Sequence, residues 1–493
     1  MRISIVVAIA GLCILPIASG QIIPIKTVPL ATGNQFSIFP STNLASGGIS
    51  VAADDRLSDP FTNPAKGYSV DGMLVLSAPQ LYSVSIDRST SEGSGISLPL
   101  GILARKGNFF GGLYWARQQL SSESHSIPGV TPALSATVAG IPNDPENNTY
   151  TFATLGTAIP EADLAVGASA FWGELNSVEG VDLLFPRSPQ VLQNGTVAEY
   201  RVSATRMMEG NQEIGVVVVR SVFKMRYDVA ASVPTGTLQS SSLQFNPEYD
   251  QTKVWGLQLR YTRPLGGPWR AGALLTTNWK DHPKIPNYDL MSIPRDPGNS
   301  TAYNLGIGLF RSQEYSFFGV DLIYEPIETE TWAEAEQPIM IHYGRFFPAG
   351  MKTVENYFTF SNWIGRIGFR SGFERSAFQF GLQFHTINYD LEQFNNVLGS
   401  KRNQHEHWIE WTLSGGYGFS VGPMRLLYTV LLTAGTGQPS ATSPVFTGWP
   451  AGARSGVSAA FDGADFLPAP GGSLSVRKGL VWTHMVSASY EIE

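Results

Sequence analysis

Hydrophobic residues that alternate with polar or small residues over ten-residue stretches constrain the fold of this sequence most. Residues 252–280 hold two such stretches, joined by a turn at residues 264–268. The apolar rows are Trp255, Leu257, Leu259 and Tyr261 in the first stretch, and Trp269, Ala271, Ala273 and Leu275 in the second, where Leu274 is the one break. Because successive strand side chains point to opposite faces, the pattern predicts a hairpin with one apolar and one mostly polar face. About ten residues is also the length that a tilted strand needs to cross a bilayer.

The same unit recurs from about residue 71 to the end of the chain. A single hairpin of this kind would also fit a soluble sandwich, but the recurrence favours an all-β, antiparallel transmembrane β-barrel. We count about fifteen strands, and single-chain barrels usually have an even number, so we predict 14 strands, with 16 as the alternative. Short turns are expected to alternate with long extracellular loops, at about residues 120–148, 176–196, 230–251, 281–300, 326–354, 390–404 and 434–478. The barrel would occupy residues 71–493 as one domain.

Composition and the N-terminus point to an exported membrane protein. Residues 1–20 combine Arg2, an apolar run and small residues at 18–20, which predicts a cleavable signal peptide and a mature chain that begins at Gln21. No later stretch offers about 20 consecutive apolar residues, so no transmembrane helix is expected. The only cysteine, Cys13, lies in the signal peptide, which excludes disulfides and thiolate catalysis in the mature chain. The net charge of −7 argues against a nucleic-acid partner. We expect the protein in the outer membrane of a diderm bacterium, surrounded by lipid.

The segment before the first predicted strand carries two short motifs. Residues 51–55 read Val-Ala-Ala-Asp-Asp, ending in Asp54 and Asp55, and Asn63, Pro64 and Ala65 follow shortly after. In these motifs the sequence resembles the FadL-type family of outer-membrane fatty-acid transporters, although Lys66 replaces the usual glycine. The secretion barrels of the PorV type open in a similar way. The resemblance implies that residues 21–70 fold into the barrel as a hatch and that the barrel takes up small hydrophobic molecules, fatty-acid-like or aromatic.

Charged residues on the polar phase of the strands are the candidates for the lining of the lumen. They are Arg201, Arg220, Lys224, Arg226, Arg260, Arg270, Arg366, Arg370, Glu199, Asp321, Glu406 and Glu410. Because buried charges must be paired or hydrated, these residues predict a wet lumen or an interior ion-pair network. Two interpretations stay open, a network that braces the barrel and a lining that selects solutes, in which arginines would bind a ligand carboxylate. Apolar residues on the same phase would form a pocket: Leu274, Phe310, Phe317, Trp408, Leu427 and Leu431.

No catalytic or cofactor-binding motif stands out, so we expect neither an enzyme nor a cofactor. His405 and His407 share one face of a strand and form a weak candidate for a metal site, with no evident third ligand. The predicted function is passive uptake of a small hydrophobic ligand through the barrel. The alternatives are a general solute porin and a secretion- or adhesion-associated scaffold barrel whose loops bind other envelope proteins.

Overall fold

The computed structural model of the chain describes ten stretches of the sequence: residues 35–86, 93–122, 146–178, 191–234, 241–282, 298–335, 338–340, 346–397, 399–439 and 476–492. The predicted signal peptide, Cys13 and Gln21 therefore lie outside the described residues, as do most of the predicted loops. Among the described residues, no helix has both the length and the apolar character needed to cross a membrane.

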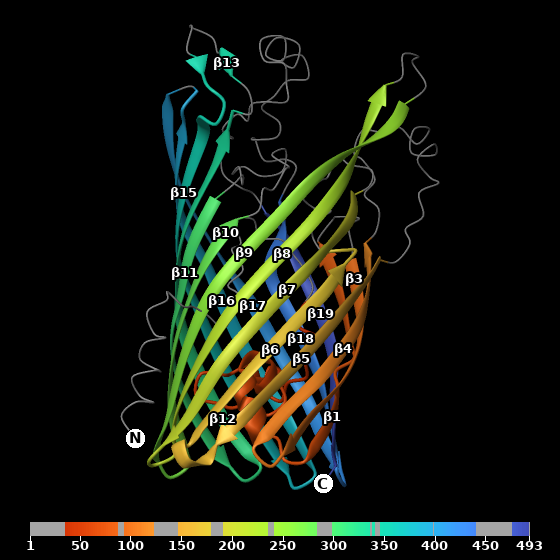
Figure 1. Cartoon of the computed structure of the whole chain (residues 1–493), viewed down its shortest axis with the longest axis vertical. Coiled ribbons are helices and arrows are strands. Elements are labelled where there is room, and N and C mark those ends of the chain that lie inside the picture. Colours follow the sequence, from red (N-terminus) through yellow and green to blue (C-terminus); the bar gives the residue numbers. More distant parts are fainter. Residues whose placement is uncertain are drawn as a thin grey trace.

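The wall of the molecule is a closed antiparallel β-barrel in which every strand pairs with its neighbours in sequence and the last strand pairs with the first (Figure 1). Its segments are β1 (Met73–Ser77), β2 (Gln80–Ile86), β3 (Gly93–Lys106), β4 (Phe109–Ser122), β5 (Glu146–Ile159), β6 (Leu164–Leu175), β7 (Val191–Met208), β8 (Gln212–Pro234), β9 (Ser241–Gly266), β10 (Trp269–His282), β11 (Gly298–Gln313), β12 (Ser316–Glu334), β15 (Lys352–Phe373), β16 (Ser376–Asn395), β17 (Ser400–Val421), β18 (Met424–Pro439) and β19 (Val476–Ile492). A small hairpin of β13 (Ile339–Met340) and β14 (Phe346–Phe347) lies apart from the wall.

The segments β1 and β2 occupy a single position in the wall, so the barrel has 16 strands, and our first choice of 14 is wrong. Both segments pair with β3 on one side and with β19 on the other. The register of each pairing is the same before and after Pro79, so the strand has no bulge here. Pro79 has no N–H to donate, but its carbonyl still accepts a hydrogen bond from the N–H of Val486.

The outward face of the wall is an apolar belt, and the predicted alternation of β9, β10 and β11 is confirmed. On β10 the outward row begins at Trp269, ends at Trp279, and carries Ala271, Ala273 and Leu275 between them. Ten residues at 3.4 Å each, tilted by about 40°, span about 26 Å, which is the height of the apolar band of a membrane barrel. Aromatic side chains suit the two edges of that band because they combine apolar bodies with polar atoms.

The strand β8 has the opposite phase to the one we predicted. Val217 and Val219 are buried in the interior, whereas Arg220 stands directly between the outward-facing Tyr200 and Trp255 of the neighbouring strands. Arg220, Lys224 and Arg226 therefore lie outside the barrel and not in the lumen. The reason for the error is the run of four valines at residues 216–219, which makes both phases of β8 apolar and leaves the phase undecided from sequence.

Several strands extend well into the ranges predicted as loops. The strongest case is residues 230–251, because β8 continues to Pro234 and β9 begins at Ser241. The same holds for β12 and β15 around residues 326–354 and for β16 and β17 around residues 390–404. Above the lipid belt both faces of a strand meet water, so the alternation that marks a strand in the sequence is lost. In Figure 1 the ends of β8 and β9 (upper right) and of β15 and its neighbours (upper left) rise well above the ends of β3 and β4.

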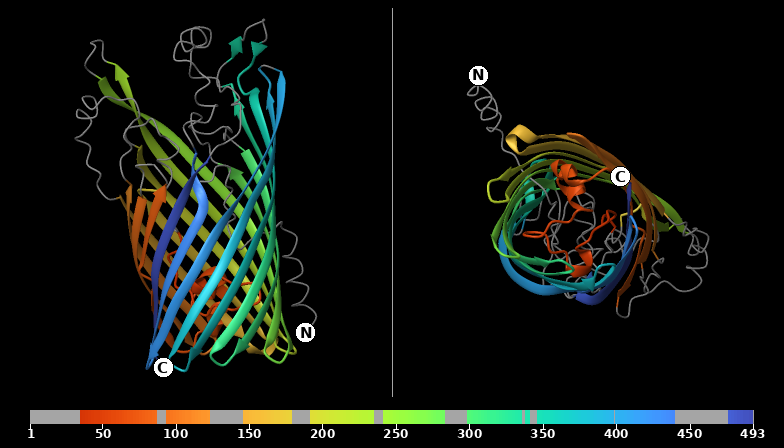
Figure 2. Two further views of the ribbon diagram at one scale, coloured as in Figure 1. Left: turned by 180° about the vertical axis from the view of Figure 1, so that it is seen from behind. Right: turned by 90° about the horizontal axis from the view of Figure 1, so that it is seen from below.

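Residues 35–70, which we call the inner segment, lie inside the lower half of the barrel (Figures 1 and 2). The segment contains three short helices: η1 (Leu44–Ser46), α2 (Asp59–Thr62) and η2 (Pro64–Ser69). Close approach of its backbone to the wall requires glycine on the strands: a Cβ on Gly381 would overlap the backbone of Gly47, and one on Gly368 would overlap the carbonyl of Ser46.

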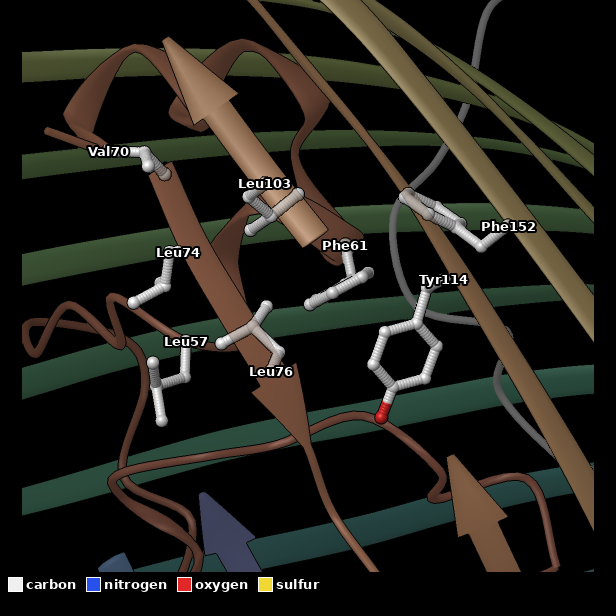
Figure 3. Close-up of a cluster of buried hydrophobic side chains, with 8 residues drawn as sticks. All are labelled: Leu57, Phe61, Val70, Leu74, Leu76, Leu103, Tyr114 and Phe152. Carbon is white, nitrogen blue, oxygen red and sulfur yellow. The ribbon is translucent and has the colours of Figure 1, made fainter. Parts of the chain in front are cut away.

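A hydrophobic core joins the inner segment to the first strands of the barrel (Figure 3). Leu57 and Phe61 of the segment pack against Leu74 and Leu76 of β1 and against Leu103 of β3, and all five are at least 90% buried. The Tyr114 hydroxyl donates a hydrogen bond of 2.7 Å to the carbonyl of Ile38. The segment is thus part of the packed interior.

Candidate functional site

A cavity of about 780 Å³ lies in the lumen between the inner segment and the wall from β5 to β10, with Arg366 of β15 also in its lining. This volume is within the range of about 300–1,000 Å³ that is typical of sites for small molecules. Its apolar side is formed by Phe39 and Phe61 of the inner segment and by wall residues that include Phe152, Phe171 and Val217.

Four phenylalanines form the apolar side of the cavity as a connected aromatic cluster. Phe39 stacks on Phe61 with ring centroids 4.3 Å apart, and it meets Phe152 edge-on at 5.5 Å and Phe171 at 6.2 Å. Such pairs add specific geometry to the burial of apolar area. Two of the rings come from the inner segment and two from the wall, so the aromatic cluster is complete only while the segment is seated.

The polar side of the cavity is basic, but its cations hold the inner segment. Arg260 donates to the carbonyls of Val51 at 3.1 Å and Ala53 at 2.7 Å, and Arg366 donates to the carbonyl of Gly48 at 3.2 Å. Arg201 donates to the carbonyl of Thr62 and pairs with Glu199, both at 2.6 Å. The other two cations of the lining, Lys66 and Lys280, are also engaged by the protein. A ligand carboxylate would therefore compete with the protein for each of these cations.

The carboxylate of Asp54 is the centre of an ion-pair network, which we call the latch, between the inner segment and the wall. It pairs with Lys66 at 3.1 Å, with Arg260 at 2.9 Å, and with Arg270. Lys66 also donates a hydrogen bond of 2.7 Å to the carboxylate of Glu213 of β8. Burial alone would raise the pKa of Asp54, but Arg260, Lys66 and Arg270 together hold it well below its usual range. The pKa of Lys66 is raised, because Asp54 and Glu213 outweigh the opposing effect of burial.

Asp59 is the one acidic residue of the lining that no described residue pairs with or hydrogen-bonds through its carboxylate. Burial raises its pKa to about 7, and Asp54 and Asp55 act in the same direction, while Arg260 and Lys66 oppose them. Near neutral pH the cavity therefore presents a carboxyl group that is divided between its neutral and charged forms.

No family model matches the sequence, and no curated protein matches it. Solved structures do match. The chain is similar to the toluene transporter TbuX of Ralstonia pickettii, with 11% identity, a TM-score of 0.41, and coverage of 93% of this chain and 100% of that one. It is also similar to a FadL homologue of Pseudomonas aeruginosa, with 12% identity, a TM-score of 0.44, and coverage of 92% of this chain and 99% of that one. A third match is the monoaromatic hydrocarbon channel CymD, with 10% identity, a TM-score of 0.42, and coverage of 94% of this chain and 99% of that one.

A FadL homologue is thus among the matches, which is the family type that the N-terminal motifs resemble. At these identities and TM-scores the matches carry no argument about function.

The N-terminal motif residues lie in the inner segment but have separate roles. Asp54 pairs with Arg260 and Arg270 of the wall. Asp55 instead stays within the segment and accepts hydrogen bonds from the N–H and hydroxyl of Thr42 and from the N–H of Leu57. The Asn63 side chain donates to Thr205, Ala65 N–H donates to Ser203, and Pro64 opens η2.

The other predicted lumen residues lie away from the cavity. Arg370, on β15, faces the interior of the barrel. Glu410, on β17, faces the interior of the barrel, and its carboxylate lies 3.8 Å from Nδ1 of His385. Glu406 accepts a hydrogen bond from the side chain of Gln404. The six apolar candidates do not form one pocket. Leu274 lines the cavity, Phe310 and Phe317 pair with each other, Trp408 packs on a separate aromatic cluster, and Leu427 and Leu431 lie on β18.

The weak metal candidate lies on the outside of the barrel. His405 and His407 are exposed on β17 with ring centroids 6.2 Å apart, and Nδ1 of His405 lies 2.9 Å from Asp390. The described part of the chain contains no group of three or more acidic, histidine or cysteine side chains placed to hold a metal ion.

Sequence analysis did not identify the phenylalanine cluster, Asp59 or Glu213 as site residues. Two signals pointed in that direction. Phe36, Phe39 and Phe61 are large aromatic residues in a segment otherwise rich in small polar ones, and Lys66 replaces a glycine in the motif. A bulky or charged residue in a segment that must pack closely requires a partner, and here the partners are the cavity and the latch.

Proposed function

We propose that this protein is an outer-membrane channel for small, uncharged hydrophobic molecules, and that residues 35–70 act as its hatch. The observation that carries the proposal is the phenylalanine-lined cavity, whose cations are all engaged by the protein. An apolar cavity with a few placed polar groups is the usual form of a small-molecule site. The belt of outward apolar residues supports placement in a lipid bilayer.

The same observation argues for an uncharged ligand over a carboxylate. Arg201, Arg260 and Arg366 would have to release backbone carbonyls of the inner segment before they could bind an anion. A ligand without charge can occupy the aromatic side and leave every one of these hydrogen bonds intact. The hatch role rests on the position of the segment across the lumen and on its bonds to the wall.

Two substitutions of adjacent valines test whether the cavity lies on the transport path. Val217 lines the cavity, and Val218 faces the lipid. Val217→Trp should fill part of the cavity and remove most of the uptake of a labelled uncharged monoaromatic hydrocarbon by cells. Val218→Trp should retain uptake, because lipid-facing tryptophan is tolerated.

Folding of both variants is checked by the heat-dependent shift in gel mobility that a closed barrel gives. The same ring carrying a carboxylate serves as the second substrate and should be taken up less well. Equal uptake by the two variants would remove the cavity from the path. Free passage of small sugars through the unaltered protein would favour a general porin instead.

A further inference from the structure

Three of the cations that we predicted to lie in the lumen form, together with Lys253, a basic patch on the outer surface of the barrel. The patch consists of Arg220, Lys224 and Arg226 of β8 and Lys253 of β9. Lys224, Arg226 and Lys253 are exposed, and Arg220 is partly buried against its neighbours. We infer that this patch binds the phosphate groups of an anionic lipid in the outer leaflet of the membrane.

The height of the patch supports a lipid headgroup as the partner. Arg220 pairs across the ladder with Trp255, and Trp255 pairs with Trp279, which ends the outward row of β10. This aromatic row marks the upper edge of the apolar belt. Lys224 lies four residues further along β8, about 10 Å higher for a tilted strand. The patch therefore begins at the edge of the hydrocarbon region and extends through the layer where headgroups lie.

The aromatic side chains keep two of the cations on the surface and pointing along it. The Arg220 guanidinium lies 4.9 Å from the ring centroid of Trp255, and that of Arg226 lies 5.9 Å from the ring centroid of Tyr249. Stacked in this way, an arginine retains free N–H donors for the oxygen atoms of a phosphate.

The charges around the patch leave it basic. Asp228 pairs with Arg226 at 2.8 Å, Asp281 lies across the ladder from Lys253, and Glu174 lies two strands from Lys224. Among the described residues, Lys224 and Lys253 form no ion pair. On the far side of the barrel, by contrast, Lys352 and Lys401 are paired with Glu330 and Glu392. Basic clusters at a membrane surface attract anionic lipids, and a phosphate supplies the charge that Lys224 and Lys253 lack.

The test is lipid binding by the purified full chain in neutral detergent, followed by native mass spectrometry. The probes are a diphosphorylated glycolipid, the same lipid with one phosphate, phosphatidylcholine, and inorganic phosphate. The test variant is Lys224→Gln with Lys253→Gln. The control variant is Arg117→Gln with Lys401→Gln, which removes two outward cations elsewhere on the upper rim.

Each cation beside an anionic membrane surface contributes about fivefold to binding, so the test variant should bind the diphosphorylated lipid about 25-fold more weakly. The control variant should bind it like the unaltered protein. Binding should fall from two phosphates to one and weaken with added salt.

Equal affinity of the test and control variants, or equal binding of phosphatidylcholine, would overturn the inference. Displacement of the lipid by inorganic phosphate at similar concentration would also overturn it, because it would show an anion site without a role for the lipid. Gel mobility confirms that both variants are folded barrels.

Discussion

The pKa values of two carboxylates in the inner segment, Asp54 and Asp59, are shifted in opposite directions, and the difference can be measured. Asp54 is held ionised by three cations, whereas burial raises the pKa of Asp59 to about 7. An aspartate with a raised pKa binds its proton in the folded state more tightly than in the unfolded state. Its stabilising effect is therefore complete below pH of about 4 and is lost as the pH rises toward 7.

We expect Asp59→Asn to flatten the dependence of stability on pH between about 4 and 7. Above pH 7 the variant should be more stable than the unaltered protein by up to about 4 kcal/mol, because it no longer carries a charge into the cavity. Chemical unfolding in detergent across this pH range measures the effect. Glu161→Gln, on an exposed turn, is the control and should leave the curve unchanged. A variant curve that is parallel to the original would refute the prediction.

Asp54→Asn should loosen the inner segment. The substitution removes the negative charge that pairs with Lys66, Arg260 and Arg270, so these partly buried cations lose an ion-pair partner. A buried pair broken in this way costs about 3–5 kcal/mol, but about a third of the Asp54 side chain is exposed, so we expect about 2 kcal/mol after screening by water. Faster hydrogen exchange of the backbone amides in residues 45–66 would show that the inner segment is held less tightly.

The control for the latch is Asp71→Asn. Asp71 is 87% exposed and lies 3.7 Å from Arg56, so its loss should cost less than about 1 kcal/mol. If both substitutions gave the same exchange rates, the latch would have no special role in holding the segment.

At the scale of the element, phase along a strand decides the effect of a charge. Leu257→Arg puts a cation on the lipid face of β9 and should cost about 2–4 kcal/mol near the midplane. Gln258→Arg, one residue further, points into the cavity and should be tolerated. Refolding into lipid vesicles measures both. Similar losses for the two variants would mean that the phase of β9 is wrong.

The elements also show what the sequence could and could not predict. The phase of β9 and β10 was readable because lipid on one face and a packed interior on the other impose strict alternation. The phase of β8 was not, because four consecutive valines satisfy either face, and its cations were then assigned to the lumen because they occupy the more polar phase of the strand. For the latch, the sequence showed only that the lumen arginines need acidic partners. It could not show which residues pair, since Asp54 and Arg260 are 206 residues apart in the chain.

At the scale of the whole molecule, removal of the inner segment should both open the barrel and weaken it. Deletion of residues 21–59 removes Phe39 from the phenylalanine cluster. It also removes Leu57 from the hydrophobic core with β1 and β3. We expect the barrel to insert but to conduct ions more readily in planar bilayers and to unfold at lower denaturant concentration. Unchanged conductance would show that the segment does not close the lumen.

The inner segment also touches the strand that closes the barrel. The N–H of Ser41 donates to the hydroxyl of Ser487, and Arg56 pairs with Glu491 at 3.0 Å, both on β19. A shift of β19 by one residue would turn both side chains toward the lipid and break these contacts. In the observed register, β19 therefore fits both the first strand and the inner segment. Residues near the beginning of the chain thus help to fix the register of the strand that ends it.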